Sequence, residues 1–440
     1  MKTELFPTQR EDVEKYLGLE DLPNFSKAGT GKTITAIAAV EALKLQSGLV
    51  VCPTIAQVMW EKKLEEELGA KVQRLETGRT EIDKTADFIV CTYGLIKPHF
   101  DSLLSRDNDA LICDESHRLK GPDSQRTKAV FGDEHDGEGG LYESSQYCLT
   151  LTGTPIERYA DDLWSQLRAT QPDALYKYGA LTLDAFQRQF CRMELKEYAE
   201  GAVLKRVSVA NQNEALLNRM LYKDIGAIRR TIADVAPYMP PVSFREIFVQ
   251  HKVDRELVSL LGGKTSEKLI QAVLDGDQAV AKARRLLGMA KLTHCISYIA
   301  DEARSDQLLV GYWHTEVGME IVEQLNKQKH VEAERIGGDA PIKRREEIKR
   351  RFQEGTTNVI VGQMGAMGEA MDGLQQACRR VIIVEDDWSS SRIEQFYKRI
   401  ARAGQKLPVI VDFLHADHEL EEAIIHVRER KEHGIGKILG

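Results

Sequence analysis

Phe25-Ser-Lys-Ala-Gly-Thr-Gly-Lys32-Thr33 is followed at once by an alanine-rich run that ends near Lys44. Glycines before a lysine and a threonine are typical of a phosphate-binding loop, in which backbone N–H groups surround phosphate oxygens. The run Thr33–Lys44 predicts a helix, and the dipole at its N-terminus favours an anion. The strict motif has glycine where this chain has Ser26. Taken alone, these residues also fit a plain helix start, so the rest of the chain has to decide.

Short apolar runs alternate with amphipathic segments along most of the chain. The first half contains Gly48–Thr54, Ala86–Tyr93, Ala110–Glu115 and Gln146–Gly153, and the second half contains Gln307–Tyr312, Val331–Ile336, Asn358–Val361, Arg380–Glu385 and Pro408–Phe413. Continuous apolar strands separated by helical patterns predict parallel sheets that are covered on both faces. We therefore expect an α/β protein with two parallel-sheet halves.

Two polar stretches of helical periodicity, about 176–236 and about 254–304, interrupt this alternation, and the lone strand candidate Ser243–Val249 lies between them. Pro240 and Pro241 stand side by side, which neither a helix interior nor a central strand tolerates. The sequence therefore predicts a first domain over 1–239 and a second over 240–440, each with one helical insertion.

The composition excludes several classes of protein. Sixty Lys and Arg against 68 Asp and Glu give a formal charge of −8, which argues against non-specific coating of nucleic acid but allows a local basic groove. The N-terminus lacks the apolar core of a signal peptide and no apolar run approaches membrane-spanning length, so we expect a cytoplasmic protein without a membrane partner. Seven scattered cysteines without a CxxC pair favour neither zinc nor disulfides.

Leu111-Ile-Cys-Asp-Glu-Ser-His117 places two carboxylates at the C-terminal end of an apolar strand. In a fold with a phosphate loop, one carboxylate at that edge can bind Mg²⁺ and the next can orient or deprotonate the attacking water. Asp114 is the candidate metal ligand, together with the hydroxyl of Thr33, and Glu115 is the candidate base. A nucleotide and Mg²⁺ are therefore the expected cofactors.

With both elements present, the chain resembles a superfamily-two helicase of the Swi/Snf type, from about Phe6 to Phe413. The helix Ala283–Lys291 and the layout after it look most like the fork-remodelling, annealing-helicase branch. The resemblance implies two RecA-like domains with helical insertions, an ATP cleft between them, and a compact motor without accessory domains.

The same resemblance assigns the nucleotide site. It implies that Gln9, in Leu5-Phe-Pro-Thr-Gln9, reads adenine. The implied nucleotide-binding residues are Gln9, Gly29, Thr30, Gly31, Lys32, Thr33 and Asp114, and the implied catalytic residues are Lys32, Glu115, Arg399 and Arg402. Arg399 and Arg402 lie three residues apart, so a helix places them on one face, where they reach a γ-phosphate only if the second domain closes over the first. Lys398 departs from the family, which commonly has aspartate there.

Leu151-Thr-Gly-Thr-Pro-Ile156 closely resembles the motif that links hydrolysis to DNA contact in this family. The implied coupling residues are His117, Thr152, Gly153, Thr154 and Gln395. The implied DNA contacts are Pro53, Thr54, Thr92, Tyr93, Lys120 and Trp388. For the strand ends at Thr54 and Thr92, a simple cap fits the residues about as well as a phosphate contact.

The resemblance implies an ATP-dependent translocase or helicase that acts, as a monomer, on duplex or branched DNA with little regard to sequence. Fork remodelling or branch migration is the finer expectation. Two alternatives stay open because fold alone does not identify a substrate. One is an ATPase switch that acts on a DNA-bound protein partner, and the other is a motor on duplex RNA.

Overall fold

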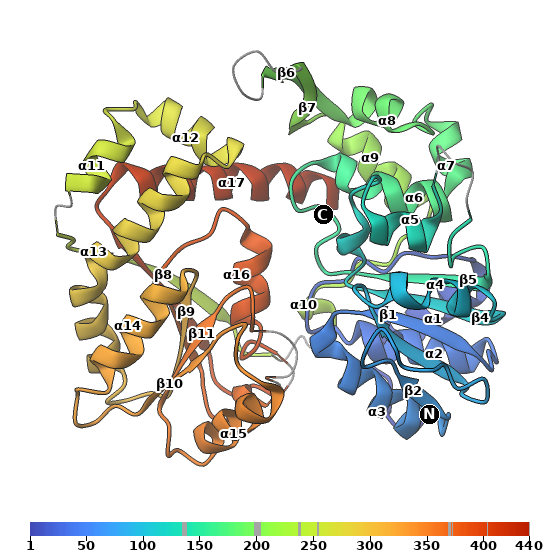
Figure 1. Ribbon diagram of the computed structural model, residues 1–440, viewed down its shortest axis with the longest axis horizontal. Helices are drawn as coiled ribbons and strands as arrows, with labels where there is room; N and C mark the ends of the chain where they lie inside the picture. Colours follow the sequence, from blue (N-terminus) through green and yellow to red (C-terminus); the bar gives the residue numbers. More distant parts are fainter. Residues whose placement is uncertain are drawn as a thin grey trace. The chain divides into compact units, whose positions relative to one another are not determined.

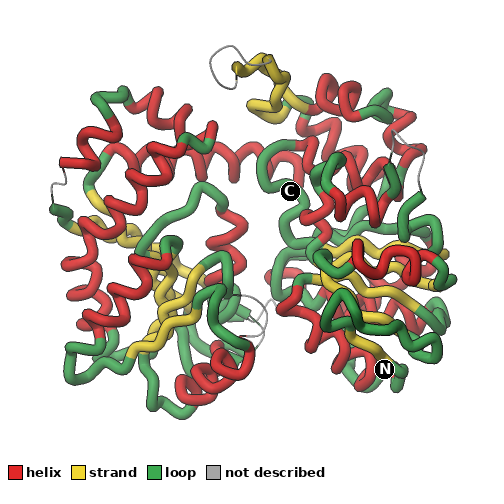
Figure 2. Tube along the Cα trace, in the orientation of Figure 1, coloured by secondary structure: helices red, strands yellow, loops and turns green. Residues whose placement is uncertain are grey.

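The computed structural model describes residues 1–133, 139–197, 204–235, 239–252, 255–367, 371, 373–402 and 404–439. The chain forms two compact units: unit 1 comprises residues 1–237 and 433–440, and unit 2 comprises residues 238–432 (Figure 1). In both units the strands lie among helices (Figure 2). Across the described ranges, no helix is long and apolar enough to cross a membrane.

Unit 1 is built on a parallel sheet of five strands in the order β2–β3–β1–β4–β5. The strands are β1 (Gly48–Cys52), β2 (Val72–Arg74), β3 (Phe88–Thr92), β4 (Asn108–Asp114) and β5 (Ser145–Leu151). Four of them confirm the predicted strands. The sequence missed β2, because three half-buried residues at a sheet edge leave no apolar run.

Helices cover both faces of this sheet, because successive strand residues point to opposite sides. Val50 packs into the cluster formed with α1 (Pro7–Gly18), α2 (Lys32–Ala42) and α3 (Gln57–Leu68). Its neighbour Val51 packs on the other side, with α4 (Ile96–Leu104) and α5 (Gln125–Phe131). Both residues are fully buried, so the sheet is the centre of the unit.

The insertion of unit 1 forms a separate cluster around Trp164 and Phe186. Its helices are α6 (Trp164–Thr170), α7 (Pro172–Lys177), α8 (Leu183–Phe190), α9 (Glu214–Arg219) and α10 (Ile232–Val235). The prediction of a wholly helical insertion over 176–236 was wrong, since β6 (Cys191–Glu197) and β7 (Leu204–Asn211) form an antiparallel hairpin. The two strands pair only with each other in the sheets of the described chain. The stretch 191–196 alternates apolar and polar residues, so a strand signal was present in the sequence and was overlooked.

Unit 2 has a parallel sheet of six strands in the order β10–β11–β9–β12–β13–β8. The strands are β8 (Val242–Val249), β9 (Leu308–Tyr312), β10 (Ala333–Ile336), β11 (Val359–Gln363), β12 (Arg380–Ile383) and β13 (Val409–Ala416). They confirm the predicted second half, including the lone strand candidate, which joins the sheet as its edge strand. Clusters on the two faces include α13 (Gln278–Glu302) with α14 (Thr315–Leu325), and α15 (Ile342–Gln353) with α16 (Ser390–Tyr397).

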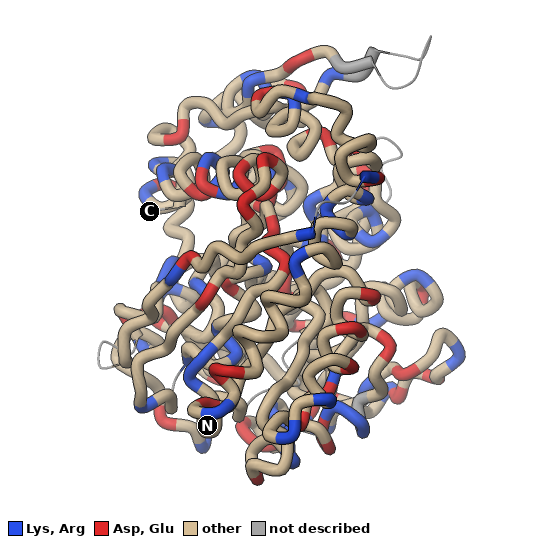
Figure 3. Tube along the Cα trace, turned by 90° about the vertical axis from the view of Figure 1, so that its left-hand side faces the viewer, with Lys and Arg blue, Asp and Glu red and all other residues tan. Residues whose placement is uncertain are grey.

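The predicted helical insertion of unit 2 forms α11 (Arg255–Leu261), α12 (Ser266–Asp275) and the first part of α13. These helices pack on α17 (Glu419–Leu439) around Leu257 and Leu420. From His433 onward the chain belongs to unit 1, where Ile438 and Leu439 join the insertion cluster. Unit 2 therefore ends before these C-terminal residues, which the sequence assigns to the second domain. Basic and acidic residues are interspersed along the chain (Figure 3), as in α15, where Arg350 pairs with Glu354.

Candidate functional site

The phosphate loop leads directly into the N-terminus of α2, with Gly31 as its N-cap. Gly29 and Gly31 have φ angles of +83° and +85°, in the left-handed region that only glycine adopts without strain. A Cβ added at Gly31 would also lie 2.3 Å from the side-chain nitrogen of Gln9. The two glycines are therefore required by the turn itself, and the loop stands where a helix dipole favours an anion.

Ser26, the departure from the strict motif, is explained by its contacts. Its buried hydroxyl accepts a hydrogen bond of 3.0 Å from the backbone N–H of Arg230. Phe25 and Lys27 on either side donate backbone hydrogen bonds of 2.8 Å to the carbonyls of Ile228 and Arg230. A glycine here would lose the hydroxyl contact, so the serine fastens the loop to the end of the insertion.

Arg230 also reaches the helix that carries Gln9. Its guanidinium donates to Asp12 Oδ1 at 2.7 and 2.9 Å and to Glu11 at 2.9 Å, both on α1. Asp12 is almost completely buried. One residue therefore connects α1, the insertion and the phosphate loop. The sequence reading missed Arg230 and Asp12, because partners more than 200 residues apart leave no local pattern.

Gln9 and Lys32 both lie against the loop. The Gln9 amide donates to the carbonyl of Thr30 at 3.3 Å and accepts from the N–H of Phe6 at 2.9 Å. The Lys32 ammonium donates to the carbonyls of Ser26 and Lys27 at 2.9 and 3.3 Å. A phosphate is a stronger acceptor for an ammonium than a neutral carbonyl, so Lys32 is placed to exchange these bonds for phosphate contacts. A contact between Gln9 and adenine stays a prediction.

Asp114 and Glu115 lie at the carboxyl end of β4. The Asp114 carboxylate accepts hydrogen bonds from the indole N–H of Trp60 at 2.9 Å and from the backbone N–H of Glu115 at 3.1 Å. Glu115 has φ +52° and ψ +50°, a left-handed conformation that costs a non-glycine residue about 1–2 kcal/mol. Such strain persists only where the surroundings impose it and is concentrated at functional sites.

The donor set at this edge fits Mg²⁺. Thr33 offers a hydroxyl at the second position of α2, and Asp114 offers a carboxylate, both of which are hard oxygen ligands. A carboxylate has about four acceptor positions, so Asp114 can accept its two hydrogen bonds and still bind a cation. A magnesium–nucleotide complex usually takes only one or two protein ligands, with phosphates and water supplying the others.

His117 joins the carboxylates to the motif that follows β5. Its Nδ1 lies 3.0 Å from the Thr152 hydroxyl, 3.3 Å from the Thr154 hydroxyl and 3.2 Å from Glu115 Oε2. Gly153 touches the phosphate loop so closely that an added Cβ would lie 3.1 Å from the N–H of Ala28. The structure therefore brings together four of the five predicted coupling residues, while the fifth, Gln395, lies on α16 in unit 2.

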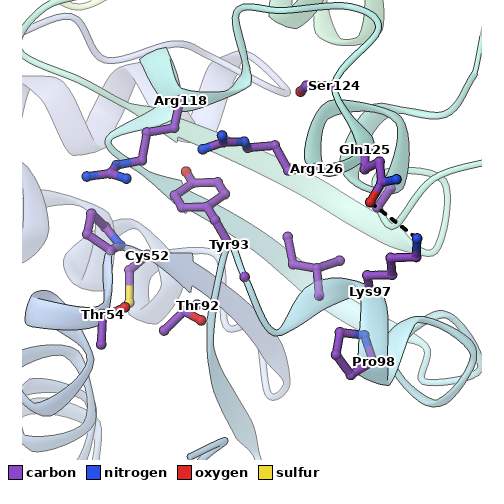
Figure 4. A pocket seen from close by; sticks show the side chains of 14 residues that line it. Cys52, Thr54, Thr92, Tyr93, Lys97, Pro98, Arg118, Ser124, Gln125 and Arg126 are labelled. Atoms are coloured by element: carbon purple, nitrogen blue, oxygen red, sulfur yellow. Dashed lines mark hydrogen bonds between the residues drawn. The ribbon is translucent and has the colours of Figure 1, made fainter. Parts of the chain in front are cut away.

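A groove of about 850 Å³ opens at the carboxyl ends of β1 and β3 (Figure 4). We call it the strand-end groove; its lining includes Pro53, Thr54, Thr92, Tyr93, Lys97, Arg118 and Arg126. The first four are predicted DNA contacts, and the structure brings them together. The three basic residues were missed. The signal in the sequence is that Lys97 and Arg118 follow the predicted strand ends closely, whereas Arg126 lies farther along the chain, in α5, and has no such signal.

Three predicted DNA contacts have other partners in the structure. The Lys120 ammonium forms an ion pair with Glu157, and Lys120 does not line the strand-end groove. The Tyr93 hydroxyl donates a hydrogen bond of 2.7 Å to the backbone carbonyl of Asp114. Trp388, in unit 2, is half-buried, with the Arg284 guanidinium 4.8 Å from its ring centre.

Arg399 and Arg402 do not lie on a helix, contrary to the prediction. The helix α16 ends at Tyr397, and turns follow, in which Arg399 N bonds to the Phe396 carbonyl at 3.1 Å. This is the i to i−3 spacing of a turn rather than the i to i−4 spacing of an α-helix. Lys398, the departure from the family pattern, pairs with Glu394 at 2.5 Å. Both arginines are half-buried, and their contact with a γ-phosphate stays a prediction.

Comparison with known proteins gives two domain matches. Residues 25–292 match the SNF2-related domain, and residues 290–404 match the helicase conserved C-terminal domain. The chain is 23% identical over its whole length to the DNA annealing helicase and endonuclease ZRANB3 of Bos taurus, of which it covers 41%. It is 21% identical to the uncharacterized ATP-dependent helicase YqhH of Bacillus subtilis, with 97% of this chain and 77% of that protein covered.

A solved structure titled Sulfolobus solfataricus SWI2/SNF2 ATPase core in complex with dsDNA aligns over 94% of this chain and 88% of its own, at 20% identity and a TM-score of 0.45. The chain is also 23% identical to the Caenorhabditis elegans homolog of SWI/SNF-related matrix-associated actin-dependent regulator of chromatin subfamily A-like protein 1, with 99% of this chain and 62% of that protein covered. The chain thus spans about two fifths to three fifths of these two curated animal relatives. Because the SNF2-related domain matches more than half of its residues, this chain belongs to the SNF2-related family.

Proposed function

We propose that this chain is an ATP hydrolase that uses ATP hydrolysis to translocate on duplex DNA. The observation that carries the proposal is that the Asp114–Glu115 pair and the basic strand-end groove lie at carboxyl ends of strands of one sheet, and that the phosphate loop lies against Gly153, which follows β5 of the same sheet. A nucleotide site and a groove for a phosphate backbone are then neighbours. The annealing helicases and the ATP-dependent helicase among the relatives support the same activity.

Lys32 binds the β- and γ-phosphates of ATP, and the glycine turn offers backbone N–H groups to them. Thr33 and Asp114 would hold Mg²⁺, which would neutralise phosphate charge when bound. Glu115 accepts a proton from the attacking water, whose oxygen bonds to the γ-phosphorus as the bond from that phosphorus to the β–γ bridging oxygen breaks. Inorganic phosphate and ADP are the products. Arg399 and Arg402 stabilise the charge that develops on the transferred group if unit 2 closes over unit 1.

The DNA contribution is electrostatic. Thr54 and Thr92 offer hydroxyl groups to a phosphate backbone, and Arg118 and Arg126 supply charge, whereas Pro53 has no donor and can only pack against the backbone. Such contacts do not identify bases, so binding is expected to be nearly independent of sequence and to weaken with salt. At the finer level, we propose branched DNA as the preferred substrate, on the strength of the annealing helicases among the relatives.

The test is steady-state ATP hydrolysis without nucleic acid and with single-stranded DNA, duplex DNA, a four-way junction or duplex RNA. Stimulation by duplex or junction DNA is expected, and Glu115→Gln is expected to lower the stimulated rate by about 10²-fold or more. A higher rate with the junction than with plain duplex supports the branched substrate. Equal rates under every condition contradict a DNA motor and favour a switch that acts on a protein, whereas selective stimulation by RNA favours an RNA motor.

A further inference from the structure

Two aromatic residues donate hydrogen bonds to Asp114, the candidate metal ligand. The Trp60 indole reaches its carboxylate at 2.9 Å, and the Tyr93 hydroxyl reaches its backbone carbonyl at 2.7 Å. Trp60 is fully buried, and only 8% of Tyr93 is exposed. The two donors therefore act on the same residue, one on its carboxylate and one on its backbone.

Tyr93 lines the strand-end groove directly, whereas Trp60 lies behind its wall. Trp60 is on the first turn of α3, which begins at Gln57, immediately after the short helix Thr54–Ala56, whose first residue lines the groove. Ala56 and Trp60 pack in one buried cluster. A shift of this wall when a phosphate backbone enters the groove is therefore passed to both donors, because close-packed side chains move together.

We propose that Trp60 and Tyr93 are positioning residues that connect the strand-end groove to Asp114, so that a DNA backbone in the groove and a magnesium nucleotide at Asp114 change each other's affinity. The inference rests on the proposed function, which supplies both ligands. Trp60 orients the carboxylate, and Tyr93 holds the backbone at the turn into Glu115. Neither side chain has to touch either ligand.

Thermodynamic linkage provides a readout other than hydrolysis. If the nucleotide changes DNA affinity, DNA changes nucleotide affinity by the same factor, typically about 5- to 150-fold. The factor is the ratio of two dissociation constants for a fluorescent DNA duplex, measured with and without a non-hydrolysable magnesium ATP analogue. A residue that only supports the fold lowers stability but does not specifically bring this ratio to one.

The variants are Tyr93→Phe, which removes only the hydroxyl, and Trp60→Phe, which removes the indole N–H. Matched controls are Tyr142→Phe, whose hydroxyl donates to Asp21 at 2.6 Å, and Trp164→Phe, whose indole donates to the Leu181 carbonyl at 3.2 Å. These controls make the same chemical changes elsewhere in unit 1. We expect the ratio to fall to about one in the first two variants and to keep its wild-type value in the controls.

Three results overturn the inference. The first is a Tyr93→Phe protein that binds both ligands and keeps the wild-type ratio; because this variant leaves no large cavity, it decides the matter even if Trp60→Phe does not fold. The second is a wild-type ratio of one when both ligands bind, which removes the coupling but leaves the proposed function standing. The third is a wild-type protein that binds neither the nucleotide analogue nor the duplex, and this result overturns the proposed function as well.

Discussion

His117 and Thr152 are in contact through Nδ1 and the hydroxyl oxygen, 3.0 Å apart, although 35 residues separate them. His117 follows the carboxylate pair at the end of β4, and Thr152 follows β5, so the contact joins two strand ends. Thr152 is completely buried. Because Thr152 is buried, its hydroxyl cannot replace His117 by a water molecule unless the surrounding residues move.

We expect Thr152→Val, which keeps the shape and removes the hydroxyl, to lower the ratio of DNA-stimulated to unstimulated ATP hydrolysis by about fivefold or more. His117→Ala is expected to lower it at least as much, and the double variant should be no worse than His117→Ala alone, since that change already removes the contact with Thr152. Strictly additive losses would show that the two residues act independently.

Lys32→Met is expected to reduce ATP hydrolysis by about 10²-fold or more, because it removes the charge that faces the phosphates. It also removes the donor to the carbonyls of Ser26 and Lys27, so nucleotide affinity should fall too. Fluorescent nucleotide binding and phosphate release measure the two effects. Lys62→Met, an exposed change on α3, is the matched control, and an equal loss there would contradict a specific role for Lys32.

Arg230→Ala leaves the buried carboxylate of Asp12 without its guanidinium and should cost about 3 kcal/mol of unfolding free energy. It should also weaken ATP binding, because Arg230 connects α1 to the loop at Ser26. Denaturant unfolding and nucleotide titration measure both. The double variant Arg230→Met with Asp12→Leu should recover stability without recovering ATP affinity, whereas full affinity in it would show that the loop does not depend on this connection.

If the strand-end groove binds DNA, the basic residues that line it should contribute more to the salt dependence of DNA affinity than a nearby basic residue outside it. Removal of Arg118 or Arg126 should reduce the slope of log affinity against log salt for duplex DNA by about one each. Lys120→Ala should change the slope less, because Lys120 pairs with Glu157 outside the groove. Fluorescence anisotropy over a salt series measures the slopes. A larger effect at Lys120 than at Arg118 would contradict the groove as the binding surface.

The pKa of the buried Glu385 carboxyl predicts that acid lowers the folding stability of unit 2. Burial opposes its ionisation, but hydrogen bonds from His314 and the charges of His314 and Arg284 lower the pKa of its carboxyl below the ordinary 4.5. A carboxyl whose pKa is lower in the folded state than in the unfolded state stabilises the fold at pH values above its unfolded-state pKa. This stabilisation is lost as the pH falls through its folded-state pKa. Glu385→Gln should therefore cost about 1–3 kcal/mol at pH 7, and the difference from wild type should shrink below about pH 4.5.

Hydrogen exchange can measure this loss of stability locally. The amides to observe are the backbone N–H groups of Trp313 and His314, which donate to Glu385 at 2.8 and 2.9 Å. Glu323→Gln, an exposed change on α14, is the control. A difference between wild type and Glu385→Gln that is constant over pH 3–7 would contradict the lowered pKa.

Local sequence was sufficient for the strands of the two sheets apart from β2, and for the residue types of the site. Apolar strands, the glycine turn before Lys32 and the acidic strand end at Asp114 are short-range features, set by backbone conformation and by burial on both sheet faces. The hairpin β6–β7 was missed although the stretch 191–196 alternates apolar and polar residues, whereas the turn at Arg399 was not predictable, since a short polar segment has no decisive period.

The sequence by itself determined which groups are present: a phosphate loop, a carboxylate pair, a histidine and a set of polar strand ends. Only the tertiary structure decided which of them meet. It placed Arg230 on Asp12, Lys120 on Glu157, and Trp60 and Tyr93 on Asp114. The physical reason is that buried polar groups must find partners, and a fold can bring those partners from any distance along the chain.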